Sequence, residues 1–185
     1  MKENQFIQSP AFRHLVIFFI LCNVAFVFGF SSIKISHEYY KSIDSDVSIY
    51  LDITEKGFEG ITNDHRSTRL LIPITAHYIS MLNPFEGKYD SPQIYLFVTS
   101  FIFFYLSSYF LYLLAREFNS HIVSIISVVI FFFHFLTVNN FFTGLPDAAE
   151  YLFSIILFYL LLNARLYYLF PLFFIAALNR ESFFL

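Results

Sequence analysis

Hydrophobic and polar positions alternate along the chain in long blocks rather than in the short periods of a soluble domain. Transmembrane α-helices need about 20 predominantly apolar residues, and short polar segments usually connect them. The pattern therefore predicts an all-α integral membrane protein with about five transmembrane helices. The expected spans are residues 15–33, 94–115, 122–138, 148–162 and 166–178.

One long polar segment, residues 34–93, interrupts this pattern. It holds nine of the 14 acidic residues and six of the 11 lysines and arginines. Within it, Leu70–Leu82 is apolar but too short to cross a bilayer, and it contains Pro73 and His77. We expect residues 34–93 to form an extracytoplasmic loop with an interfacial helix at about 70–82.

The basic residues outside this segment predict the orientation of the chain. If residues 1–14 are cytoplasmic, the short inner segments carry Lys2 and Arg13, then Arg116, then Arg165, as the positive-inside rule requires. The long loop, the start of the fourth span and the end of the fifth then share the outer face. We therefore expect the N-terminus of this integral membrane protein to be cytoplasmic.

Composition excludes several classes of protein. The chain is 57% hydrophobic and only 14% charged, whereas a soluble domain carries roughly 25% charged residues. No run of lysines and arginines is present, which argues against nucleic acid as a partner. The sequence contains no phosphate-binding glycine loop, no serine-hydrolase motif and no metal-site spacing of histidines, cysteines and acids.

The most acidic part of the loop is "IDSDVSIYLDITEKGFEG", which contains Asp44 and Asp46. A carboxylate at a membrane surface can act as a general base toward an acceptor hydroxyl, or bind a divalent cation beside a phosphate. The alternative is an ordinary solvated acidic loop.

Arg66 and Arg69 follow at i, i+3 spacing and share a face if the segment is helical, so they can bind a phosphate together. Their alternative role is anchoring at the membrane interface.

Two further ionisable pairs lie at the ends of expected spans. Asp147 and Glu150 begin a stripe with Tyr151 and Ser154 that should face a cavity rather than lipid, unless the acids merely cap the helix.

Arg180 and Glu181 follow the fifth span and are candidates for substrate binding, or for an ion pair that closes a helix end. His77 and His134 are expected to be packed, neutral histidines bonded to neighbouring helices.

The order of these features resembles the multi-span GT-C glycosyltransferases, over roughly residues 15–185. The similar segments are the acidic outer loop leading to "RLLIP", and "TGLPDAAEYLFSIILFYLL" followed by "LFPLFFIAALNRESFF". The resemblance is closest to the bacterial members that use polyprenyl-phosphate sugars, which implies a location in the inner (plasma) membrane of a bacterium. It implies transfer of a sugar from that carrier to a glycan, lipid or protein acceptor outside the cytoplasm.

The resemblance also implies residue roles. An aspartate in the first outer loop acts as the base or a metal-associated residue, which falls on Asp46 with Asp44 as competitor. Arginines near the outer face hold the carrier phosphate, which falls on Arg180 and Arg69. The chain lacks later spans of this superfamily and ends in "RESFFL", where a hydrophobic run begins. We therefore expect it to be the N-terminal portion of a longer protein.

Two other functions fit the same residues. A transporter or flippase for a lipid-linked glycan would use the arginines for phosphate and need no base. A noncatalytic membrane subunit would use the polar stripe to contact a partner span. The sequence leaves the sugar, the acceptor and any divalent-cation requirement open.

Overall fold

A computed structural model describes residues 12, 16–24, 26–27, 46–61, 69–82, 92–134 and 147–179. All regular secondary structure in these ranges is helical, and they contain no β-strand. The prediction of an all-helical chain is therefore confirmed for the part that the structure describes.

The helix α5, Pro92–Arg116, is the central element of the fold. Its 25 residues span about 37 Å at 1.5 Å per residue, which exceeds the roughly 30 Å hydrocarbon core of a bilayer. Within the described ranges it is the one helix long and apolar enough to cross a membrane. The span expected at residues 94–115 thus has the length and apolarity that crossing requires.

The helices found at the other expected spans are shorter. Helix α6 is His121–Phe133, and it ends there because His134 adopts extended backbone angles (φ −65°, ψ 137°). Helix α8 is Asp147–Leu162. The last expected span begins with a 3-10 turn, η5 (Leu166–Tyr168), and continues as α9, Leu169–Ala177. Residues 16–24 and 26–27 of the first expected span are helical.

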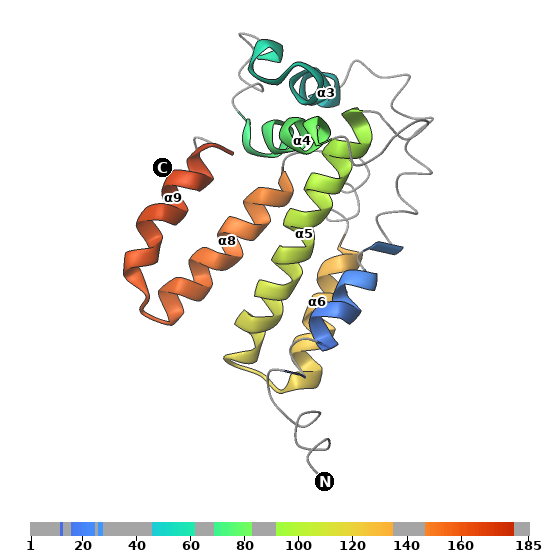
Figure 1. The fold of residues 1–185 in the computed structure, drawn as a ribbon. Helices are drawn as coiled ribbons and strands as arrows, with labels where there is room; N and C mark the ends of the chain where they lie inside the picture. Colours follow the sequence, from blue (N-terminus) through green and yellow to red (C-terminus); the bar gives the residue numbers. More distant parts are fainter. Residues whose placement is uncertain are drawn as a thin grey trace.

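Figure 1 shows α5, α6, α8 and α9 side by side as a bundle, with α3 and α4 lying across one end. Helix α8 packs more extensively against α5 than any other pair of elements does in the described structure. Small residues are buried on both helices, including Ser107 and Ser108 on α5 and Ala148 and Ala149 on α8. Small side chains let helix backbones approach closely, which is the usual way transmembrane helices associate.

Phenylalanine and tyrosine side chains join the first helical segment and α6 to α5. The ring of Phe18, in the first helical segment, lies 4.6 Å from the ring of Tyr105 and 5.1 Å from that of Tyr109. On another side, Phe104 stacks on Phe131 of α6 with ring centroids 5.0 Å apart. The high aromatic content therefore forms inter-helix contacts along α5.

The part of the acidic segment that the structure describes, residues 46–60, is helical. It forms helix α3, Asp46–Lys56, followed by the 3-10 turn η2, Gly57–Gly60. Val47, Tyr50 and Ile53 are buried on one face of α3, and this i, i+3 spacing of apolar residues is the pattern of an amphipathic helix. Asp52 and Glu55 obscure that pattern in the sequence, because these two acids are exposed on another side of the helix.

The expected interfacial helix is confirmed as a helix. It is α4, Leu71–Met81. Pro73 does not break it, because the residue lies in the first turn, where no backbone N–H is needed. Helix α4 packs against both α3 and α5, and so joins the end of the bundle to α3.

Candidate functional site

Two residues chosen from the sequence meet at the end of the bundle below α4. Nη1 of Arg69 lies 3.3 Å from Oδ1 of Asp147, although 78 positions separate them in the chain. The side chains are 26% and 23% exposed, so the pair is partly sheltered from water. A single guanidinium nitrogen makes this contact, which leaves the geometry short of a bidentate pair.

The start of α4 is bonded to the end of α9 at the same place. The carbonyl oxygen of Leu178 accepts hydrogen bonds from the backbone N–H groups of Leu70 (3.1 Å) and Leu71 (3.2 Å). These are N–H groups at a helix start, which lack partners within their own helix. The carbonyl end of α9 thus faces the N–H end of α4, an electrostatically favourable meeting of helix dipoles.

Asn179 completes this region, which we call the Arg69 junction (Arg69, Leu70, Leu71, Asp147, Leu178 and Asn179). Asn179 is only 1% exposed, and its side-chain oxygen has no hydrogen-bond partner in the described structure. Its backbone N–H donates to the carbonyl of Ala176 at 2.9 Å. Three segments that are distant in sequence, 69–71, 147 and 178–179, therefore meet at one end of the bundle.

The polar stripe on α8 serves more than one kind of contact. Asp147 and Glu150 lie in the first turn, where the helix dipole favours negative charge. Tyr151 instead packs edge-on against the rings of Phe104 and Phe131, 6.5 Å and 5.9 Å away. The four residues of the stripe (Asp147, Glu150, Tyr151 and Ser154) are all half-buried.

Among the remaining residues selected from the sequence, only Asp46 lies in the part of the chain that the structure describes. Asp46 is the first residue of α3. Because α3 lies across the same end of the bundle as the Arg69 junction (Figure 1), the two regions share that end. Asp44, Arg66, Arg180 and Glu181 lie outside the described residues.

The two histidines differ from each other. Nδ1 of His77 lies 2.9 Å from the carbonyl oxygen of Thr54, so this ring is bonded to the neighbouring helix α3, as expected. The expectation for His134 is wrong, because its side chain is exposed at the end of α6. No group of three or more histidines, cysteines and acids forms a metal-binding cluster in the described ranges.

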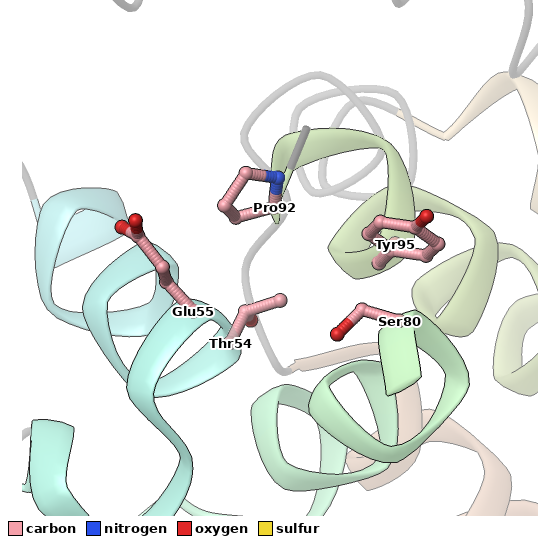
Figure 2. A pocket seen from close by; sticks show the side chains of 5 residues that line it. All are labelled: Thr54, Glu55, Ser80, Pro92 and Tyr95. Atoms are coloured by element: carbon pink, nitrogen blue, oxygen red, sulfur yellow. The ribbon is translucent and has the colours of Figure 1, made fainter. Parts of the chain in front are cut away.

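A hollow of about 280 Å³ lies where α3, α4 and α5 meet. Figure 2 shows Thr54 and Glu55 of α3 across from Ser80 of α4, with Pro92 and Tyr95 of α5 closing the far side. Glu55 was not among the residues selected from the sequence. No local pattern separates Glu55 from the other exposed acid of α3, Asp52, so only the packing of α3 against α4 and α5 makes it a candidate.

Comparisons with known proteins do not assign this site. No protein-family model, no curated protein and no solved structure matches the chain.

Proposed function

We propose that the chain is an integral-membrane glycosyltransferase, or the N-terminal part of one, that transfers a sugar from a polyprenyl-phosphate carrier to an extracytoplasmic acceptor. The proposal includes about five membrane spans with α3 and α4 on the outer face. Besides α5, the apolar helices α6 and η5–α9 support this arrangement, because large apolar side chains remain exposed on them. Examples are Ile122, Ile130, Phe170 and Phe174.

The observation that carries the proposal is that the Arg69 guanidinium uses few of its hydrogen-bond donors. Its one hydrogen bond in the described structure is the Nη1 contact to Asp147, and its side chain is 26% exposed. A guanidinium has five N–H donors arranged to match phosphate oxygens. Arg69 therefore keeps donors for an anionic headgroup at this end of the bundle.

The proposed chemistry needs few protein groups. A hydroxyl oxygen of the acceptor attacks the anomeric carbon of the sugar and loses its proton to a carboxylate, for which Asp46 is the first candidate and Asp44 the second. The bond from the anomeric carbon to the phosphate oxygen breaks, and the phosphate leaves with the electron pair. Arg69 and Arg180 would stabilise its charge, with greater effect in a water-poor site than in solution.

The same ion pair also favours a second function, that of a noncatalytic membrane subunit. A contact between Arg69 and Asp147 fixes α4 to the start of α8 whether or not a substrate exists. In that case the ion pair only stabilises the packing at the end of the bundle and binds no substrate.

Exchanging the two charges separates these functions. The variant R69D/D147R keeps an ion pair in place, whereas R69D alone sets two acids against each other. We expect R69D to lower protein abundance, and the exchange to recover abundance but not sugar transfer from a radiolabelled polyprenyl-phosphate sugar in native membranes. Recovery of both abundance and transfer would assign Arg69 a structural role only.

A further inference from the structure

The hollow between α3, α4 and α5 has a lining suited to a particular kind of ligand. Among the described lining residues, the polar side chains are the Glu55 carboxylate and the hydroxyl groups of Thr54, Ser80 and Tyr95. The hydroxyls of Ser80 and Thr54 already donate to backbone carbonyls. The Ser80 hydroxyl donates to the carbonyl of His77 at 2.7 Å, and the Thr54 hydroxyl donates to the carbonyl of Tyr50 at 2.8 Å. What Glu55 and Ser80 offer to a ligand is therefore hydrogen-bond acceptors.

The walls of the hollow are held in place by His77. Because the carbonyl of Thr54 can only accept, Nδ1 of His77 donates this 2.9 Å bond, and the His77 carbonyl in turn holds Ser80. Gly57 adopts a positive φ of 64°, and a Cβ there would lie 2.8 Å from Nε2 of His77. Glycine thus lets the imidazole lie against the α3–η2 turn, so the two walls are organised before any ligand binds.

Charge narrows the choice of ligand. An anion such as a phosphate would face the Glu55 carboxylate, and no basic side chain is among the lining residues that the structure describes. A neutral molecule rich in hydroxyl donors matches the acceptor lining.

The volume of the hollow limits the choice of ligand further. The volume of about 280 Å³ lies just below the range of roughly 300–1,000 Å³ that holds drug-sized ligands. A single sugar-sized ring fits within it, and a larger ligand would extend past the rim, where the exposed Glu55 lies (Figure 2).

We propose that this hollow binds a neutral, hydroxyl-rich ligand of monosaccharide size, with Glu55 accepting hydrogen bonds from its hydroxyl groups. The inference about binding stands apart from the proposed transferase reaction. The further assignment of the occupant as the acceptor of that reaction rests on the proposed function. The carrier phosphate would then bind elsewhere, at the Arg69 junction.

Ligand-observed NMR on the purified full chain in detergent tests the site. The probes are the methyl glycosides of glucose, galactose and mannose at millimolar concentration, with choline and inorganic phosphate as cationic and anionic probes. We expect at least one glycoside to bind, and Glu55→Gln to weaken it about tenfold, equivalent to about 1.4 kcal/mol. Glu59→Gln is the matched control, because Glu59 is exposed on η2 and is not part of the lining.

Three results would overturn the inference: no glycoside binds, choline or phosphate binds in place of the glycosides, or Glu55→Gln and Glu59→Gln bind glycoside equally. The transferase proposal fails separately. Glycoside binding that depends on Glu55, in a protein that transfers no sugar, would support this site and contradict the proposed reaction.

Discussion

Arg69, just before α4, and Asp147, the first residue of α8, form an ion pair with 3.3 Å between Nη1 and Oδ1. The contact joins the start of α4, which lies across the end of the bundle, to α8 within the bundle. Leu178 at the end of α9 reinforces the junction through its carbonyl oxygen. The stability of this end of the molecule therefore depends on residues from three distant parts of the chain.

A double-mutant cycle on this pair should give a measurable coupling energy. We expect Arg69→Gln and Asp147→Asn to be coupled by about 1 kcal/mol, the upper end for ion pairs that are not fully buried. Equilibrium unfolding of the four proteins in detergent measures it. The matched control is the Lys56–Asp52 pair on α3, with side chains 53% and 51% exposed, for which about 0.3–0.5 kcal/mol is expected. Equal coupling in the two cycles would contradict a special role for the junction.

Gly57→Ala should destabilise the packing of α3 against α4. The left-handed backbone at φ 64° costs an L-residue about 1–2 kcal/mol, and the new Cβ would also meet the His77 ring at 2.8 Å. Thermal unfolding of the purified protein measures the loss. In Gly57→Ala/His77→Ala the steric conflict is gone while the backbone cost remains, so Gly57→Ala should cost less there than in the wild type. An identical cost in both backgrounds would show that the ring plays no part.

Ala164→Gly should stabilise the protein by up to about 1 kcal/mol. Ala164 has a positive φ of 52° in the turn after α8, where Ala164 N–H donates to Leu161 and Arg165 N–H to Leu160. This is the Schellman arrangement, in which glycine is preferred at the left-handed position. The control Ala115→Gly, within α5, should destabilise the protein by about 1 kcal/mol because glycine is unfavourable in a helix. A lower melting temperature for Ala164→Gly would refute the prediction.

Asp46→Asn should reduce sugar transfer by roughly 10²–10⁴-fold, the usual contribution of a general base, with protein abundance unchanged. Transfer from a radiolabelled polyprenyl-phosphate sugar in membranes is the measurement. Asp52→Asn is the control on the same helix, because Asp52 is exposed and pairs only with Lys56 in the described structure. Full activity in Asp46→Asn would move the role of base to Asp44, and full activity in Asp44→Asn too would end the proposed mechanism.

Cysteine labelling should place the two ends of α5 on opposite sides of the membrane. In a Cys22→Ala background, a cysteine at position 46 should react with an impermeant maleimide added outside intact cells. A cysteine at Asn119, in the exposed turn after α5, should react only after the membrane is opened. Labelling of both positions in intact cells would contradict a membrane-crossing α5.

The sequence by itself determined the helical class, the position of α5 and the position of α4, because each depends on local composition. A long apolar run must satisfy its backbone hydrogen bonds within itself, and a helix does so without reference to the rest of the chain. Asp147 and Arg69 were also found from local signals, namely an acid at a helix start and a basic residue before an apolar segment.

Only the tertiary structure decided which of these residues meet. The pairing of Arg69 with Asp147 depends on how α4 lies across α8, and the two bonds to Leu178 depend on where α9 ends. Glu55 became a candidate only when α3 was seen to close a hollow against α4 and α5. Contacts between distant segments follow from packing of whole helices, for which a single sequence carries no local signal.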